Sequence, residues 1–334
     1  GLSDIFELPV GARAMALGGA YVAIAEEPFA LYWNPAALEN VSYPGIGLYY
    51  SNLPGGTHYS YMALTYPSLF FGTFAIGYLG IGINDVQTKD IDATDLGTEN
   101  YGRSLFMFGY GYKLLDFMSL GATLKLEHAR FIGYPDEMTG ATSNIQDSSF
   151  GADFGVLITP SFDRFFLQNI RIGASLQNGV QRVTQPGEVR EKSPRNLRVG
   201  IAKRIPLTLY NSDLLFVFDI SRNDKTASVP THYHLGFEYS YMGHFMARLG
   251  FDHRGSGLGG NGPTYGIGIK QLGMTFDYSF WAGGYEDLSN SHRVSVVYEM
   301  GKSRAQRMED HLAAESERIR REVMTALQRQ REQE

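Results

Sequence analysis

Residues 231–252 read THYHLGFEYSYMGHFMARLGFD, and apolar and polar side chains alternate on both sides of Met242-Gly243. Leu235 and Phe237 fall on one face of an extended chain, and Glu238 falls on the other. A period of two indicates a strand with one apolar and one polar face, whereas a helix shows a period of 3.6. The stretch therefore predicts two antiparallel strands joined by a tight turn.

The same alternation recurs at residues 120–127 and 274–280. Segments of about ten residues suit a strand that crosses a membrane at a tilt. Glycine and serine recur on the polar face, where the lumen of a barrel leaves little room, and tyrosines gather at strand ends, as in an interfacial girdle. A soluble sandwich also alternates, but these features favour a membrane barrel. Residues 61–83 are uncharged and long enough for a membrane helix, yet Pro67 and the glycines there favour two strands.

The connections between the expected strands alternate in length. We expect strands to begin near Ile46, His58, Leu69, Tyr101, Phe117, Ser148, Asn169, Asn196, Leu214, Thr231, His244, Thr264, Met274 and Ser291. Long connections fall at 82–100, 132–147, 178–194, 222–230, 253–263 and 282–290, tight ones at 67–68, 114–116, 242–243 and 271–273, and intermediate ones at 160–167 and 205–213. Long loops on one rim and short turns on the other are typical of outer-membrane barrels. An even strand number then places both termini on the periplasmic side.

We therefore predict an all-β fold, a transmembrane antiparallel β-barrel of about 14 strands over residues 43–300. Residues 1–42 form a separate N-terminal segment before the barrel, and residues 301–334 form a C-terminal periplasmic α-helix. The start at Gly1 and the absence of cysteine fit a mature envelope protein after removal of a signal peptide. The net charge of −6, without a basic block, makes nucleic acid an unfavourable partner. We expect a bacterial outer-membrane protein that contacts membrane lipid.

The run GARAMALGGAYVAIAEEPFALYWNPAAL at residues 11–38 resembles the N-terminal signature of the PorV/PorQ family, which lies within the FadL-like outer-membrane barrels. SNSHRVSV at residues 289–296 resembles the last strand of that family. In the family the N-terminal segment packs inside the barrel as a hatch. The resemblance thus implies that Trp33, Asn34 and Pro35 belong to a plug. A periplasmic cap without a transport role is the alternative.

The C-terminal segment is rich in Glu, Arg, Gln and Ala, and the family resemblance does not predict it. Five apolar side chains lie near one face of the expected helix, namely Met308, Leu312, Ile319, Val323 and Leu327. A solvated helix and a helix docked on a partner both fit this pattern. Because a lone helix with a thin apolar stripe is marginal in water, we expect it to bind a periplasmic or outer-membrane protein. Glu315 and Ser316 interrupt a heptad, which argues against a long zipper.

Polar side chains on the inward face of the strands predict a lumen network of Lys125, Glu127, His232, His234, Glu238, Arg248, Asp252 and Asp277. His232 and His234 share a strand face, where a metal pair is the alternative to a hydrogen-bonded network. Asp90, Asp92, Asp95 and Glu99 are a weaker calcium candidate, since they lack the order of an EF-hand loop. The glycines at 255, 257, 259, 260 and 262 predict a surface loop rather than a phosphate site. We expect no bound metal and no cofactor.

Two functions follow for a chain in which no catalytic triad is evident. Resemblance to PorV implies a non-enzymatic adaptor subunit in an envelope assembly of the type IX secretion kind. Resemblance to FadL implies a passive channel for hydrophobic small molecules, with a ligand held in the lumen. An apolar pocket between residues 29–33 and the barrel wall would favour the channel. We take the adaptor as the first hypothesis and the channel as its alternative.

Overall fold

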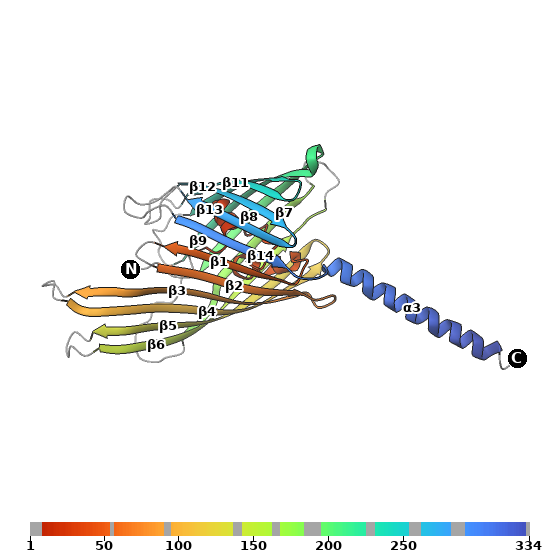
Figure 1. The fold of residues 1–334 in the computed structure, drawn as a ribbon, viewed down its shortest axis with the longest axis horizontal. Helices are drawn as coiled ribbons and strands as arrows, with labels where there is room; N and C mark the ends of the chain where they lie inside the picture. The colour runs from red at the N-terminus through yellow and green to blue at the C-terminus, as the bar shows by residue number, and fades with distance from the viewer. Residues whose placement is uncertain are drawn as a thin grey trace.

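In a computed structural model, fourteen antiparallel strands close into one barrel, with each strand paired to its chain neighbours and β1 paired to β14. The structure describes residues 9–53, 57–89, 95–135, 142–161, 168–183, 195–224, 231–253, 262–281 and 291–331. The strands are β1 Gly45–Leu53, β2 Thr57–Pro67, β3 Thr73–Lys89, β4 Asp95–Leu115, β5 Met118–Pro135, β6 Thr142–Ile158, β7 Ile170–Val183, β8 Asn196–Leu207, β9 Ser212–Asn223, β10 His232–Tyr241, β11 Phe245–His253, β12 Gly262–Gln271, β13 Met274–Trp281 and β14 Ser291–Glu299. The predicted fold class is confirmed (Figure 1).

The short-turn rim forms as the sequence predicts. Met242 and Gly243 both have positive φ, as do Leu272 and Gly273. This is the backbone of a tight hairpin turn whose twist matches that of its strands. The turn after β2 is longer than the predicted dipeptide, because residues 68–72 separate β2 from β3. The short 3-10 helix η5, Leu209–Asn211, connects β8 to β9.

The strands β3 to β6 are much longer than the expected ten residues. β4 has 21 residues and β5 has 18, whereas β13 has 8. The connections predicted at 82–100 and 132–147 are therefore wrong in large part, because residues 82–89, 95–100, 132–135 and 142–147 are strand. Strand pairing continues past the rim of the barrel in the hairpins β3–β4 and β5–β6. The two strands of each hairpin satisfy each other's backbone hydrogen bonds there. Figure 1 shows these two hairpins extending past the other strands.

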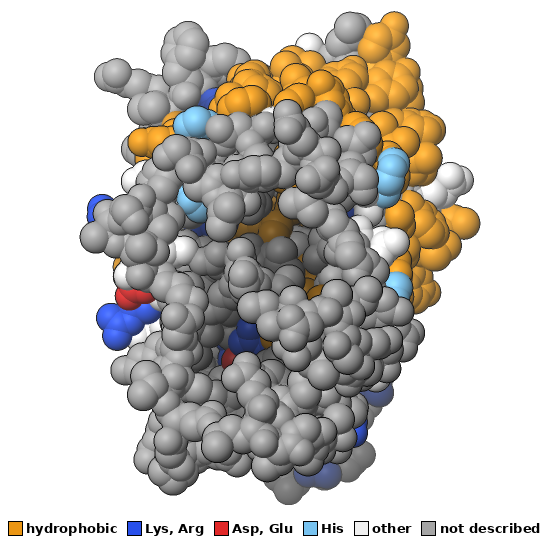
Figure 2. All heavy atoms as spheres, turned by 90° about the vertical axis from the view of Figure 1, so that its left-hand side faces the viewer, with side chains coloured by type: hydrophobic (Ala, Val, Ile, Leu, Met, Phe, Trp, Pro, Cys, Tyr) orange, Lys and Arg blue, Asp and Glu red, His pale blue; other side chains and the backbone are white. Residues whose placement is uncertain are grey.

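Alternation sorts the side chains into an apolar exterior and a mixed interior. On β4 and β5, Phe106, Phe108, Leu124 and Leu126 are exposed, while their neighbours Leu105 and Met107 are buried. Hydrophobic side chains cover the upper and right-hand outside of the barrel in Figure 2. An outward apolar belt is what a barrel needs to sit in lipid. Among the described residues, no helix has the length and hydrophobicity to cross a membrane.

Three short helices precede β1, namely α1 Ala12–Ala16, α2 Ala30–Trp33 and the 3-10 helix η2 Pro35–Asn40. Pro9 lies beside Asn196, Asn223 and His232, at the ends of strands opposite the short-turn rim. β1 begins and β14 ends at the short-turn rim, with Gly45 paired to Glu299. The expectation that both ends of the chain share one side is therefore wrong for the described segment. An even strand number places the start of β1 and the end of β14 at the same rim. It does not place the residues before β1, and residues 9–41 run through the lumen from the opposite rim.

The C-terminal helix α3, Arg304–Arg331, projects from the short-turn rim (Figure 1). Its first residue follows a capping box, in which the Ser303 Oγ accepts from the Gln306 N–H at 3.2 Å and the Gln306 side chain accepts from the Ser303 N–H at 2.9 Å. The helix base is fixed to the rim, since the Arg304 N–H donates to the Ser42 carbonyl at 2.7 Å. The Arg304 side chain also pairs with Glu39 at the end of η2.

Candidate functional site

Residues 9–41, here called the inner segment, fill the lumen and contact strands all around it. Every residue of α1 and α2 is buried. The Ala12 N–H donates to the Ser295 Oγ on β14 at 3.2 Å, and the Gly18 N–H donates to the Thr264 Oγ1 on β12 at 3.0 Å. On the opposite side, the Thr123 hydroxyl of β5 donates to the Leu31 carbonyl at 3.1 Å. The wall thus supplies the polar partners that the short helices lack.

Glycines on the inner wall let the inner segment approach the strands closely. A Cβ atom added to Gly236 would lie 2.7 Å from the Leu17 Cβ, and one added to Gly111 would lie 2.7 Å from the carbonyl oxygen of Pro35. These contacts are too short for any side chain larger than hydrogen, and one of them is with backbone. The glycines that the sequence places on the polar strand face are therefore where segment and wall touch.

Trp33 packs at the centre of the inner segment. Its indole N–H donates to the Val10 carbonyl at 2.8 Å, which joins the beginning of the segment to α2. The Tyr21 ring meets it edge-on at 5.7 Å between centroids, and the Arg198 guanidinium lies 4.8 Å from its ring. Trp33 is 1% exposed. The side chain therefore holds the segment together and places an apolar ring against a cation of the wall.

Asn34 joins three parts of the molecule. Its amide nitrogen donates to the Val22 carbonyl at 2.9 Å and to the Val156 carbonyl on β6 at 3.1 Å. Its amide oxygen accepts from the Ala36 N–H at 3.1 Å and so caps η2, with Pro35 at the first position of that helix. Trp33, Asn34 and Pro35 are thus all buried inside the barrel.

One side of the inner segment is apolar. The Phe29 and Tyr61 rings contact each other, with centroids 5.6 Å apart, and Leu31 packs against Gly77 and Gly109 of the wall. These side chains form one buried hydrophobic cluster with inward-facing residues of β1 to β4, namely Tyr49, Tyr59, Leu79, Ile81, Leu105 and Met107. We call these six residues and Tyr61 the apolar strip. Residues 29–33 therefore meet the wall at a packed apolar contact.

The opposite side of the inner segment is held by buried charges. Arg13 donates to both carboxylate oxygens of Glu238, each at 2.9 Å, and to Glu27 at 2.8 Å. Arg248 donates to Glu238 at 2.6 Å and to Asp277 at 2.6 Å. Such bidentate and bridging contacts satisfy charges that burial would otherwise make costly. The structure thus brings together the predicted residues Glu238, Arg248 and Asp277.

Glu26 extends the ionic contacts to the next strands. Its carboxylate contacts Arg171 on β7 at 3.1 Å, Arg204 on β8 at 3.3 Å and Arg13 at 3.5 Å. Burial raises the pKa of Glu26, but the three arginines outweigh burial and hold the pKa below its ordinary value of 4.5. Glu26 is therefore a carboxylate at neutral pH and links the inner segment to the wall.

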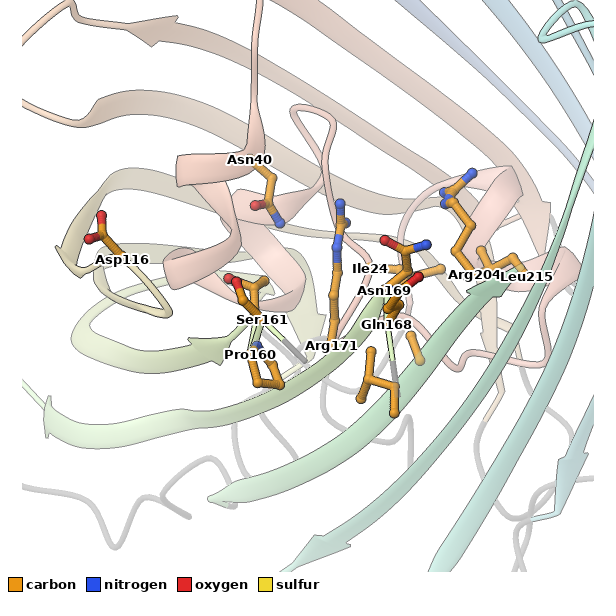
Figure 3. Close-up of a pocket in the computed structure, with 13 residues that line it drawn as sticks. Ile24, Asn40, Asp116, Pro160, Ser161, Gln168, Asn169, Arg171, Arg204 and Leu215 are labelled. Atoms are coloured by element: carbon orange, nitrogen blue, oxygen red, sulfur yellow. The ribbon is translucent and has the colours of Figure 1, made fainter. Parts of the chain in front are cut away.

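A polar cavity of about 590 Å³ lies at the short-turn end beside this cluster. Arg171, Arg204, Asn40 and Asn169 surround it in Figure 3. A second cavity of about 370 Å³ shares Asn40 and Arg204 with the first and reaches Lys270 and Glu299. Both cavities lie between the inner segment and the rim from which α3 projects. The short-turn end of the lumen is thus polar and charged, in contrast to the apolar strip.

Lys125 and Glu127 pair with partners other than the Glu238 cluster. Lys125 contacts Asp153 at 2.6 Å and donates to the Asn178 side chain at 3.4 Å, where the β6–β7 ladder shifts register. Glu127 accepts from Arg103 on β4 at 2.7 Å. The predicted lumen residues therefore fall into separate clusters rather than one network.

His234 and Asp252 form a third cluster near the opposite rim. The His234 ring contacts the Gly18 carbonyl at 2.8 Å, the Ser221 hydroxyl at 3.0 Å and Asp252 at 3.1 Å. The centroid of the His232 ring lies 6.5 Å from that of the His234 ring. In the part of the chain that the structure describes, no group of three or more His, Asp or Glu side chains could hold a metal ion. The calcium candidate at Asp90, Asp92, Asp95 and Glu99, and the glycines at 255, 257, 259 and 260, lie outside the described side chains.

The sequence interpretation missed the residues that complete these clusters. Arg13, Glu26 and Glu27 are the only charged residues between positions 9 and 38, in a run rich in Gly and Ala. Charges in so apolar a run need buried partners, which was the available signal. Asp219 was missed too, although it accepts from two consecutive backbone N–H groups of the inner segment at 2.7 and 2.9 Å.

Several solved structures resemble this barrel. The toluene transporter TbuX of Ralstonia pickettii matches 89% of this chain and 100% of its own at 12% identity, with a TM-score of 0.61. The monoaromatic hydrocarbon channel CymD matches 87% of this chain and 97% of its own at 13% identity, with a TM-score of 0.60. A FadL homologue of Pseudomonas aeruginosa matches 88% and 99% at 11% identity, with a TM-score of 0.54. No family model and no curated protein matches the chain by sequence. The chain therefore shares the FadL-like fold.

Proposed function

We propose that this chain is an outer-membrane channel through which hydrophobic small molecules pass, with the inner segment as its plug. The observation that carries the proposal is the apolar strip, which gives one side of the lumen a continuous hydrophobic face against Phe29 and Leu31. A hydrophobic solute gains free energy wherever apolar wall replaces its water. A pore for hydrophilic solutes does not require an apolar wall.

The shared fold supports this function over the adaptor. The similar structures are described as a toluene transporter and a monoaromatic hydrocarbon channel. The exposed apolar belt of the barrel supports a place in the outer membrane. We place the short-turn rim and α3 in the periplasm, as the loop rhythm predicts.

The plug must move or rearrange for a solute to cross. It separates Pro9, at one rim, from the polar cavities at the other. Its apolar side touches the strip by packing and by one neutral hydrogen bond, from the Tyr61 hydroxyl to the Pro28 carbonyl at 3.3 Å. Its opposite side is joined to Glu238 and Asp219 by charge-assisted hydrogen bonds. Local displacement is thus less costly along the strip, and we propose this side as the path.

The adaptor stays as a second candidate because of α3. Its exposed apolar stripe fits a helix that binds another protein, which a channel does not require. The PorV/PorQ resemblance contributes to this candidate only through residues 11–38 and 289–296.

Uptake of labelled toluene by cells expressing the chain tests the channel. Replacing Leu105 and Met107 by Gln makes the strip polar at two adjacent inward positions and should reduce uptake about tenfold, since losing one apolar contact costs ~1–3 kcal/mol. The matched variant Leu105→Met with Met107→Leu keeps the strip apolar and should retain uptake. Heat-modifiable gel mobility verifies that both variants fold. Equal uptake by the two folded variants would contradict the proposed path.

A further inference from the structure

α3 is exposed along almost its entire length. None of its residues is buried, and Leu312, Ile319, Val323 and Leu327 are 57, 51, 51 and 50% exposed. Among the described residues, α3 touches the barrel at its base, where Arg304 and Arg307 bond to the rim and the His311 ring meets Phe70 at 5.4 Å between centroids. Aliphatic side chains on one face of an otherwise polar helix are the usual sign of a contact surface.

The spacing of this apolar face is symmetric. Five apolar side chains and Ser316 make up this face, at Met308, Leu312, Ser316, Ile319, Val323 and Leu327, which we call the α3 stripe. Met324 is also exposed but lies outside it. The positions of the stripe are separated by four, four, three, four and four residues, so the order is the same from either end. At about 100° per residue, all six lie within an arc of roughly 100°. The midpoint of the stripe falls between Glu317 and Arg318.

This symmetry matches an antiparallel pair of identical helices. A twofold axis through the midpoint places Met308 opposite Leu327 of the second copy, Leu312 opposite Val323, and Ser316 opposite Ile319. Each contact then occurs twice, as a twofold interface requires. A parallel pair would instead place every position opposite itself, with serine against serine at the centre.

Between Met308 and Leu327, the charges of α3 are divided at the same midpoint. Residues 308–317 contain four acidic residues, Glu309, Asp310, Glu315 and Glu317, and no Lys or Arg. Residues 318–327, which face them in an antiparallel pair, contain three arginines, at 318, 320 and 321, and a single acid, Glu322. An antiparallel pair sets the acidic half of each helix against the basic half of the other. A parallel pair sets like charges against each other, which is unfavourable.

We propose that α3 binds α3 of a second copy of this chain as an antiparallel pair through the α3 stripe. For two barrels in one membrane, the twofold axis runs along the membrane normal, so the paired helices must run across that axis. Figure 1 shows α3 running outward from the short-turn rim in nearly the direction in which β14 points, so the pairing requires the chain to bend between β14 and α3. The chain turns towards α3 at Gly301, whose φ is +66°, a conformation that glycine adopts without strain.

Disulfide mapping on the full chain tests the pairing, since the sequence contains no cysteine. Two differently tagged copies, Leu312→Cys and Val323→Cys, are expressed together, oxidised mildly in membranes and separated by tag. A disulfide needs Cα atoms within about 7 Å, so the mixed dimer should form in about tenfold excess over either self-linked dimer. The control pair is Asp310→Cys with Thr325→Cys, which lies at the same height on the opposite helix face and should not link.

Three outcomes overturn the proposal. Self-linked Leu312→Cys dimers in equal or greater yield would indicate a parallel pair. Linking of the far-face pair as efficient as that of the stripe pair would indicate random collision. Absence of any link, in barrels that retain heat-modifiable mobility, would show that a second copy does not cover the stripe. Met308→Cys with Leu327→Cys is a second stripe pair, and it must agree with the first. None of these outcomes depends on transport.

Discussion

Arg13, Glu26 and Glu27 carry all the charge of the inner segment up to Leu38, and each is paired. Arg13 meets Glu238 across a sequence separation of 225 residues. Buried ion pairs of this kind add little net stability over an apolar core, but the loss of one partner is costly. Their effect is to define one position of the inner segment in the lumen.

Replacing Arg248 by Leu should destabilise the barrel by about 3–5 kcal/mol, because it removes the cation that both Glu238 and Asp277 contact. The midpoint of urea unfolding, followed by heat-modifiable mobility, measures the loss. Arg195→Leu is the matched control, since Arg195 and Asp224 are both more than half exposed and such a pair contributes ~0–1 kcal/mol. Equal effects of the two substitutions would contradict the proposed role of the cluster.

The contacts of Glu26 predict a pH dependence. Because its pKa in the folded protein lies below 4.5, its contribution is complete above that pH and is lost as the pH falls through the lowered value. Glu26→Gln should therefore unfold at lower urea than the wild type at neutral pH. The two should converge as the pH is lowered through that pKa. A difference that grows on acidification would show that Glu26 acts in another way.

At the scale of elements, glycines on β8 to β12 leave the space that the inner segment and its short helices occupy in the lumen. Gly250 of β11 faces the backbone of Leu17 and Gly18, and Gly266 of β12 faces Ala16. The helices are too short to be stable alone, so the wall orders them. The conformation of the inner segment thus depends on its contacts with the barrel wall.

Deletion of residues 1–41 should raise single-channel conductance in planar bilayers, because the segment fills the lumen between Pro9 and the polar cavities. The control is the deletion of residues 304–334, which removes α3 and should leave conductance near that of the full chain. Heat-modifiable mobility of both variants verifies folding. A folded barrel that conducts no more than the full chain would show that the plug does not set the permeability.

At the scale of the whole molecule, the barrel has two different ends. The short-turn end carries α3 and the charged cavities, and the other end carries the long hairpins β3–β4 and β5–β6 (Figure 1). Such asymmetry fits a barrel inserted in one direction, with its turns in the periplasm.

Epitope tags test this orientation. A tag inserted at Thr94, between β3 and β4, should be labelled on intact cells. A tag at Gly243, in the turn between β10 and β11, should be labelled only after the outer membrane is permeabilised. Labelling of the Gly243 tag on intact cells would reverse the orientation, and with it the periplasmic position of α3.

The sequence by itself determined the barrel, its strand number and α3, because alternation and helical capping depend on residues close together in the chain. The period of two around Leu235 and the capping box at Ser303 are such local signals. It also located Trp33, Asn34 and Pro35 in a separate segment before β1.

Only the tertiary structure decided which charges meet, how far β3 to β6 extend and which way the inner segment crosses the lumen. Glu238 and Arg13 are adjacent only because the barrel closes around the segment. Alternation reveals that Glu238 faces inwards but carries no information about its partner. The partner is determined by the geometry of closure, since every inward side chain of a barrel faces the same enclosed space.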